Sequence, residues 1–507
     1  MNSKINRRKF LKGSVVAATA GLTFGCKSTD ISKSAAKPNL LFVFSDQHSR
    51  DMLGCYGNSQ VISPNIDAFA KDSIRFENCV SSQPVCTPYR GMLFTGRHPL
   101  YNGCFSNDIQ LLDTGGNSFG ELLKREGYST GYFGKWHLYG GDRDRAIPAG
   151  KRRHGFDVFK SNNCHLNYQP EKCFYFDENG KKVYFDKWEP YGQTQQACEF
   201  IEKNADKPFA AFVSWHPPHN VGADNYPSTY LDGATKELLD LYDPAAIKLR
   251  PNAEDTPQIR QAYHGHMAMI TGVDKAFGEL VRKLKELGLY DNTLIIFTAD
   301  HGDMLRSNKR CGPKSCPEVE SVGVPFILKM PGSIRENTST ETLLGAMDIM
   351  PTTLSLLDIN PPETVQGVSF ADDIIRGNDD GVDSIPLMYF APAWRGVYTK
   401  RYTYARGVVY VPQGQKDNDF SESANVLYDR KKDPYELTNR FDDPDYEEVK
   451  AELEAKTQQW LEKFEDKFWD GKYILKKLMN RETIGFWAKG DTGIMTCPNT
   501  MPIDILK

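Results

Sequence analysis

Residues 40–47 read Leu-Leu-Phe-Val-Phe-Ser-Asp-Gln, an apolar run that ends in the polar side chains of Asp46 and Gln47. The same pattern recurs in Phe-Ala-Ala-Phe-Val-Ser-Trp-His-Pro-Pro-His at residues 209–219 and in Leu-Ile-Ile-Phe-Thr-Ala-Asp-His at residues 294–301. Continuous rather than alternating apolar runs are typical of parallel strands that helices cover on both faces. Ligands bind such sheets beyond the carboxyl ends of the strands. We therefore predict that Asp46, His219 and Asp300 meet at one edge of a parallel sheet.

Helical patterns alternate with these strands, which indicates an α/β fold. They cover residues 118–126, 257–287 and 348–357. Beyond the polar run at residues 377–381 lie two aromatic-rich segments with strand-like alternation, followed by a helical pattern; these are residues 395–399, 401–411 and 447–464. We predict a mostly parallel sheet covered by helices at residues 38–380, and a smaller C-terminal α+β domain with an antiparallel sheet at residues 381–507.

Composition excludes some classes of protein. The 507 residues are 25% charged, and 62 Lys and Arg against 66 Asp and Glu give a formal net charge of -4. This balance argues against a disordered acidic chain and against a broad basic surface for nucleic acid. A chain of this length buries a large core.

The N-terminus indicates export. Arg7, Arg8 and Lys9 precede an apolar stretch at residues 13–25, which suits an export signal and is too short to span a bilayer. The segment resembles a twin-arginine signal, and Cys26 at its end resembles a bacterial lipoprotein cleavage site. We predict a signal at residues 1–26 with Cys26 lipidated, a tether at residues 27–37, and a periplasmic or membrane-anchored location. A soluble exported protein is the alternative.

The segment Val-Cys-Thr-Pro-Tyr-Arg-Gly-Met-Leu-Phe-Thr-Gly-Arg at residues 85–97 carries the chemistry. It reads as a loop that enters a helix, so Cys86 lies near a helix N-terminus, where anions are favoured. Cys86 alone would suit a buried apolar position or a nucleophilic thiolate. However, Asp46 and Asp300 suit a hard cation such as Ca²⁺ or Mg²⁺, for which sulfur is a poor ligand. Conversion of Cys86 to an oxygen-bearing group would remove this conflict.

Cys86, Pro88 and Arg90, followed by Leu-x-Thr-Gly, resemble the signature of the formylglycine-dependent type I sulfatases of the alkaline phosphatase superfamily. Further blocks of the chain are similar to the family, at residues 38–47, 134–138, 218–219, 298–303, 347–352 and 427–437. The resemblance covers almost the whole chain after the tether, and it implies an alkaline-phosphatase-like fold. It also implies that a maturase oxidises Cys86 to formylglycine, whose hydrate is the nucleophile.

The resemblance implies a set of ligands for a divalent cation, expected to be Ca²⁺ with Mg²⁺ as the alternative. The set is Asp46, Gln47, Asp300 and His301, together with the modified Cys86. Many relatives have Asn at the position of His301. The cation would polarise the sulfate oxygens and favour the ionised nucleophile.

Three further roles follow from the same resemblance. Arg90 would position the aldehyde hydrate, and Lys135 would neutralise the sulfate. His137 would take the proton from the second hydroxyl of the hydrate, which expels sulfate and restores the aldehyde. Lys135 and His137 are two residues apart, so in an extended segment they face the same side.

The leaving group would meet a second set of residues. His219 is the candidate general acid for the departing alcohol, and Lys314 would contact both the sulfate and the leaving group. Trp394 and Arg395 in the C-terminal region are candidates for lining the substrate pocket, with Arg395 as a substrate-binding residue.

We therefore predict a sulfuric ester hydrolase that acts on a sulfated carbohydrate, either a polysaccharide or a glycosaminoglycan fragment. One alternative is a phosphomonoester or phosphonate hydrolase of the same superfamily. The other is a non-catalytic glycan-binding lipoprotein in which Cys86 stays unmodified. We expect no nucleic-acid partner, and contact with a membrane only through the N-terminal lipid. The sugar, the position of its sulfate, exo or endo action and the oligomeric state are left open.

Overall fold

The fold is taken from a computed structural model, which describes residues 37–222, 229–309, 312–330, 336–379, 381–390, 393–409 and 423–467. The predicted signal at residues 1–26, the lipidated Cys26 and most of the tether lie outside the described residues. Within the described part of the chain, no helix is long and apolar enough to cross a membrane.

A ten-stranded sheet forms the centre of the molecule, in the order β10-β2-β9-β8-β1-β7-β3-β4-β5-β6. Its strands are β1 (Asn39–Asp46), β2 (Ile74–Val80), β3 (Ser129–Lys135), β4 (Val158–Asn162), β5 (Phe174–Phe176), β6 (Lys182–Tyr184), β7 (Phe209–Pro218), β8 (Thr293–Ala299), β9 (Phe326–Lys329) and β10 (Thr338–Gly345). The neighbours β8, β1, β7, β3 and β4 are parallel to one another, as the apolar runs predict. The carboxyl ends of these strands therefore lie along one edge.

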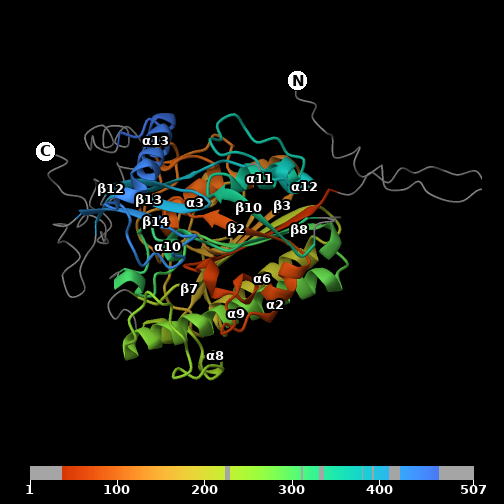
Figure 1. Ribbon diagram of the computed structural model, residues 1–507. Helices are drawn as coiled ribbons and strands as arrows, with labels where there is room; N and C mark the ends of the chain where they lie inside the picture. Colours follow the sequence, from red (N-terminus) through yellow and green to blue (C-terminus); the bar gives the residue numbers. More distant parts are fainter. Residues whose placement is uncertain are drawn as a thin grey trace, which may run out of the picture.

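Helices cover both faces of this sheet (Figure 1). One face packs against α2 (Pro64–Lys71), α6 (Glu189–Lys203), α7 (Thr229–Gly233), α8 (Lys236–Leu239) and α9 (Pro257–Glu286). The other packs against α3 (Cys86–Thr95), α5 (Phe119–Arg125), α11 (Ile349–Leu356) and α12 (Ala371–Arg376). The short helices α4 (Pro99–Asn102) and α10 (Val319–Val322) lie in connections. The predicted helices correspond to α5, α9, α11 and, in the C-terminal region, α13 (Glu447–Lys463).

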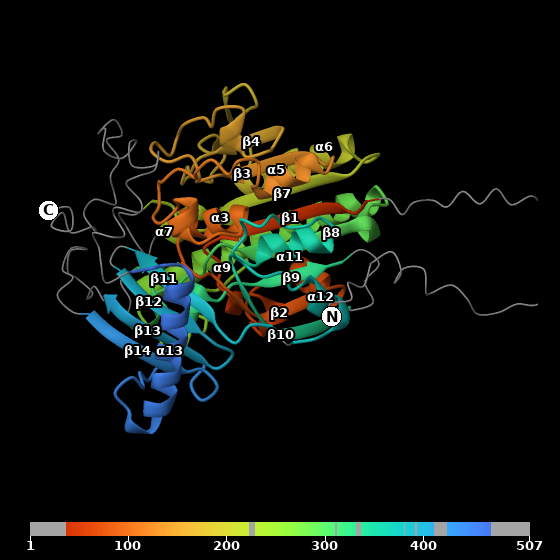
Figure 2. The ribbon, with the colours of Figure 1, turned by 90° about the horizontal axis from the view of Figure 1, so that it is seen from above.

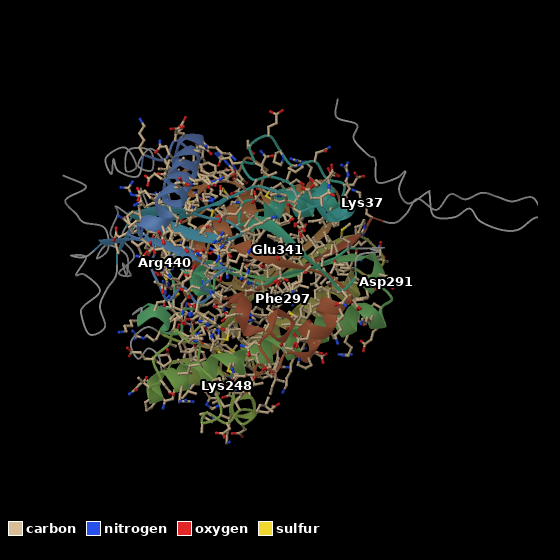
Figure 3. The ribbon with its side chains drawn as sticks, in the orientation of Figure 1. Lys37, Lys248, Asp291, Phe297, Glu341 and Arg440 are labelled. Carbon is tan, nitrogen blue, oxygen red and sulfur yellow. The ribbon has the colours of Figure 1, made fainter. Side chains whose placement is uncertain are left out.

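The first strand shows why its apolar run is continuous. Leu40, Phe42 and Phe44 enter the core on one face of the sheet, and Leu41 and Val43 enter the core on the other. Side chains alternate between the faces of a strand, so burial on both sides requires apolar residues at every position. Figure 3 shows the same enclosure for β8, where Phe297 lies inside the molecule and Asp291, just before the strand, lies at its rim.

A separate antiparallel sheet follows, in the order β11-β12-β13-β14 (Figure 2). Its strands are β11 (Ile385–Phe390), β12 (Ala393–Tyr398), β13 (Tyr402–Val409) and β14 (Ser423–Asp429), and α13 (Glu447–Lys463) packs against it. The antiparallel pairing confirms the fold class predicted for this region. The exact domain boundary near residue 380 remains a prediction.

Candidate functional site

Adjacent strands deliver the predicted site residues to one edge of the large sheet. Asp46 is the last residue of β1, and Lys135 is the last residue of β3. Asp300 directly follows β8, and His219 directly follows β7. Since β8, β1, β7 and β3 are consecutive neighbours, these side chains converge, as the strand pattern predicts.

A buried cluster with the character of a metal site lies at this edge. Asp46, Cys86, Asp300 and His301 offer ligand atoms that all lie within 4.8 Å of one another. Cys86 is the first residue of α3, and its Sγ atom is 3.3 Å from Nε2 of His301 and 3.7 Å from Oδ1 of Asp46. The helix N-terminus and the strand ends thus face the same small volume.

Gln47 and His301 are held in orientations that suit a cation. Nε2 of Gln47 donates to Oδ2 of Asp303 at 2.8 Å and to Oδ1 of Asn220 at 3.2 Å, whereas the buried Oε1 of Gln47 has no hydrogen-bond partner among the described residues. Nδ1 of His301 lies 3.0 Å from the carbonyl oxygen of Gly302 and must donate to it, which leaves Nε2 facing the cluster. The residues therefore fit a divalent cation through two carboxylates, an amide oxygen and an imidazole.

Cationic side chains compensate the buried carboxylates. The Arg90 guanidinium is 3.1 Å from Asp300 and 3.5 Å from Asp46, and Lys135 forms a buried ion pair with Asp46. Burial raises the pKa of Asp46, but Lys135 and its other cationic neighbours hold that pKa well below its usual range. Burial and the neighbouring Asp46 instead raise the pKa of Asp300.

Arg90 has little freedom to move. One of its terminal nitrogens donates to the carbonyl oxygen of Lys135 at 2.7 Å and to Oγ of Ser214 at 2.8 Å, and its side chain is fully buried. Arg90 therefore links the helix that carries Cys86 to β3 and β7. This anchoring agrees with a positioning role.

Lys314 and His219 form a pair beside Cys86. Nζ of Lys314 lies 3.3 Å from Sγ of Cys86 and 3.1 Å from Nε2 of His219. Nδ1 of His219 donates to the carbonyl oxygen of Asn220 at 2.6 Å, so Nε2 accepts a hydrogen bond from the ammonium group. Burial and Lys314 lower the pKa of His219 to about 3. The role of His219 as the general acid remains a prediction.

His137 follows β3, and its Nε2 atom is 2.9 Å from Oδ1 of Asp108. Burial by itself would lower the pKa of His137. The neighbouring Cys164 and the hydrogen bond to Asp108 outweigh burial and raise this pKa to about 10. Sequence reasoning missed Asp108, which lies in an irregular loop with no recognisable pattern. It also missed Asp303, although this residue lies inside the quoted block at residues 298–303.

Arg395 has different contacts from those expected of a substrate-binding residue. Its guanidinium forms a buried ion pair with Asp466 at 2.5 Å and also donates to the carbonyl oxygen of Trp394 at 2.9 Å. Trp394 instead donates through Nε1 to the carbonyl oxygen of Ser315 at 3.1 Å, beside Lys314. Neighbouring residues of a strand point to opposite faces, so Trp394, not Arg395, faces the segment that carries Lys314.

Cation binding is predicted to stabilise the protein in a pH-dependent manner. At a Ca²⁺ concentration 100 times the dissociation constant, the folded state should gain about 2.7 kcal/mol. The pKa values of Asp300 and His301 are both raised. Burial raises the pKa of Asp300, whereas burial lowers that of His301 and the nearby Asp300 carboxylate raises it above its usual value. Protons therefore compete with the cation, and the Ca²⁺-dependent rise in melting temperature should shrink as the pH falls.

The measurement is thermal unfolding of chelator-treated protein with and without added Ca²⁺. Asp300→Asn and Gln47→Leu should abolish the rise. Asp157→Asn, which changes an exposed carboxylate paired with Lys124, should leave it intact. An equal rise in all four proteins would show that Ca²⁺ binds elsewhere.

Comparison of the chain with known proteins identifies its family. A family model described as sulfatase matches residues 38–359, and a second, described as the C-terminal region of N-sulphoglucosamine sulphohydrolase, matches residues 316–463. An ulvan-active sulfatase of Formosa agariphila is 33% identical over 482 residues, covering 91% of this chain and 89% of that protein. An endo-4-O-sulfatase of Bacteroides thetaiotaomicron is 29% identical over 514 residues, covering 90% and 98% of the two chains.

A solved structure, described under the metabolism of multiple glycosaminoglycans by Bacteroides thetaiotaomicron, superimposes with a TM-score of 0.76 at 27% identity. It covers 88% of this chain and 99% of that one. The matched segment of the first family model includes every residue of the cluster around Cys86. The chain therefore belongs to the sulfatase family, the enzymes that hydrolyse sulfuric esters.

Proposed function

We propose that this sulfatase removes sulfate from a sulfated saccharide, with a formylglycine made from Cys86 and a bound divalent cation, expected to be Ca²⁺. The observation that carries the proposal is the position of Cys86 at the start of α3. There it faces the carboxylates of Asp46 and Asp300 on one side and the ammonium group of Lys314 on the other. A maturase that oxidises the thiol is the implied partner.

The chain's own groups favour an oxygen nucleophile at position 86. Asp46, Gln47 and Asp300 present oxygen atoms, which hard cations prefer and which match sulfur poorly. A cation held there would supply charge that polarises the sulfate oxygens. The hydrated aldehyde would supply the attacking oxygen. Arg90 orients residue 86 through its contacts with Asp300 and with the end of β3.

The sulfate and its leaving group would meet Lys314 and His219. Lys314 is only half-buried, whereas Asp46, Cys86 and Asp300 are fully enclosed, so a substrate must approach from the side of Lys314. Its ammonium group can neutralise a sulfate oxygen. The proton shared by Lys314 and Nε2 of His219 can pass to the oxygen of the departing alcohol.

The names of the relatives support a carbohydrate as substrate. One similar protein is described as acting on ulvan and another as an endo-4-O-sulfatase. Aromatic residues make up 12% of the chain, which is compatible with stacking on sugar rings. The sugar and the position of its sulfate stay open.

Conversion of Cys86 is predicted to be visible in the mass of its peptide. Protein made together with the maturation machinery should carry residue 86 lighter than cysteine by about 18 Da, as expected for oxidation of a thiol to an aldehyde. Peptide mass spectrometry checks this. Cys86→Ala protein should show no shift and should release no sulfate. A free thiol in correctly matured protein would favour the glycan-binding alternative.

The role of the proton donors is predicted to depend on the leaving group. Lys314→Met and His219→Gln should lower kcat/KM for a sugar sulfate by about 10²-fold or more, because the alkoxide needs a proton. The same variants should affect an activated aryl sulfate much less, because a phenolate leaves without one. The check is a comparison of the two substrates. Equal losses on both would assign the pair to binding rather than to proton transfer.

A matched set of phosphate and phosphonate esters tests the alternative chemistry. The proposal expects sulfate esters to be hydrolysed with the higher kcat/KM. A preference for phosphonate or phosphate monoesters would make the chain a phosphoryl-hydrolysing relative within the same fold.

We also infer an exported lipoprotein from the sequence of residues 1–26. Expressed in a bacterial host, the chain should partition with membranes and carry lipid on Cys26. Cys26→Ser should abolish the lipid, and an unchanged partition of this variant would contradict the anchor.

A further inference from the structure

The main chain of His137 is fixed on both sides, but this alone does not orient its ring. The His137 amide donates to the carbonyl oxygen of Asn163 at 2.7 Å, and its carbonyl oxygen accepts from Oγ1 of Thr87 at 2.8 Å. The residue has a positive φ of 54°. The direction of the imidazole therefore depends on contacts of the ring itself.

Asp108 supplies such a contact. Its Oδ1 atom lies 2.9 Å from Nε2 of His137, and its side chain is 10% exposed. Burial opposes ionisation of this carboxyl, but the hydrogen bonds from His137 and Arg143 hold its pKa far below the usual range. An ionised carboxylate only accepts hydrogen bonds, so Nε2 carries the proton. Cys164 is the second side chain that forms a hydrogen bond with the His137 ring.

Arg143 fixes Asp108 in turn. Its Nε atom donates to Oδ1 and its terminal nitrogen donates to Oδ2 of Asp108, both at 2.8 Å. This two-point contact sets the plane of the carboxylate as well as its position. The result is a chain of contacts from Arg143 through Asp108 to the ring of His137, outside the cluster that would hold the cation.

The loop that carries Asp108 also touches the helix of the nucleophile. Oδ1 of Asn107 accepts from the backbone amide of Thr87 at 3.1 Å, one residue after Cys86. The carbonyl oxygen of Asp108 accepts from the amide of Gly141 at 3.1 Å, which ties the loop to the segment after His137. Two consecutive side chains thus align the start of α3 with His137.

We propose that Asp108, held by Arg143, is a positioning residue that fixes the imidazole of His137 in the orientation needed for release of sulfate from residue 86. The inference rests on the proposed function, because the step requires the hydrate formed at residue 86. In the step concerned, the O–H bond of the sulfated hydrate breaks and its proton passes to the deprotonated imidazole of His137. The electron pair forms the C=O bond of the aldehyde, and the C–O bond to sulfate breaks, releasing sulfate.

The charges around His137 predict the effect of removing the carboxylate. The ring is flanked by the Asp108 carboxylate and by Cys164, which would be an anion as a thiolate. Two cations, Lys135 and Arg143, contribute positive charge around His137. Burial lowers the pKa of His137, while Cys164 and Asp108 raise it to about 10. An amide at position 108 should lower this pKa, so the limb of kcat that reports deprotonation of His137 should move to lower pH.

The experiment compares Asp108→Asn and Arg143→Lys with the mature wild-type enzyme. A matched control is Asp144→Asn, since Asp144 lies in the same loop as Arg143 and contacts a different histidine, His165, at 3.0 Å. Peptide mass confirms that residue 86 is converted in each protein. Steady-state kinetics give kcat and KM across pH. Peptide mass after rapid quenching reports sulfate held covalently on residue 86.

We expect Asp108→Asn to lower kcat by about 10²-fold, with KM within about twofold of wild type and sulfate retained on residue 86. Arg143→Lys, which keeps the charge but loses the two-point contact, should give a smaller loss in the same direction. The Asp144→Asn control should match wild type.

A kcat for Asp108→Asn within twofold of wild type, with no retained sulfate, would overturn the inference. So would a rise in KM at unchanged kcat, which would assign Asp108 to substrate binding. Melting temperatures identify loss by unfolding, in which case Arg143→Lys carries the test alone. Failure of the wild-type enzyme to convert residue 86 or to release sulfate would instead overturn the proposed function.

Discussion

The burial of two like charges side by side is the constraint on which this site depends. Asp46 and Asp300 are both fully enclosed, and isolated buried carboxylates would be strongly unfavourable. Two cations compensate the negative charge: Arg90 contacts both carboxylates, and Lys135 contacts Asp46. A divalent cation would complete this compensation, and Oε1 of Gln47, which has no hydrogen-bond partner among the described residues, could help to bind one. The fixed cations and the metal-binding atoms are therefore parts of one electrostatic arrangement.

The parallel sheet can hold this arrangement of buried charges because the residues that pack the core and the residues that carry charge lie at different positions along its strands. Along β1 each residue from Leu40 to Phe44 packs into one of the two cores, and the functional carboxylate of Asp46 stands at the end of the strand. The turn after β8 is equally constrained. A side chain on Gly302 would place its Cβ 1.9 Å from the carbonyl oxygen of Glu320, so glycine is required where this turn packs against the segment before β9. Asp300 and His301 are thereby held rigidly in the cluster.

The sequence predicts the three central strands β1, β7 and β8, four of the helices and the convergence of Asp46 and Asp300 from periodicity alone. The place of Cys86 beside them follows from the motif and its resemblance to the family. The sequence does not predict which face of a later strand meets the site. Arg395 therefore appears as a candidate, although its partner is Asp466 and its neighbour Trp394 contacts Ser315. Asp108 could not be found either, since its contact with His137 joins loops 29 residues apart and leaves no periodic signal. Long-range pairing of irregular segments is the information that a single sequence lacks.

Lys314 shows why the second sheet belongs to the chemistry as well as to the fold. Its segment lies outside the regular strands and is held at two points: the carbonyl oxygen of Pro313 accepts from the amide of Met304 at 2.7 Å, and that of Ser315 accepts from Trp394 on β12. The first contact fixes Lys314 to the turn that carries His301, and the second fixes it to the antiparallel sheet. Lys314 is the half-buried cation beside Cys86, so its proposed role at the leaving group would depend on the antiparallel sheet that holds its segment. The proposed site thus joins two parts of the fold: the charged cluster at the end of the parallel sheet, and a lysine whose segment is held by the C-terminal sheet.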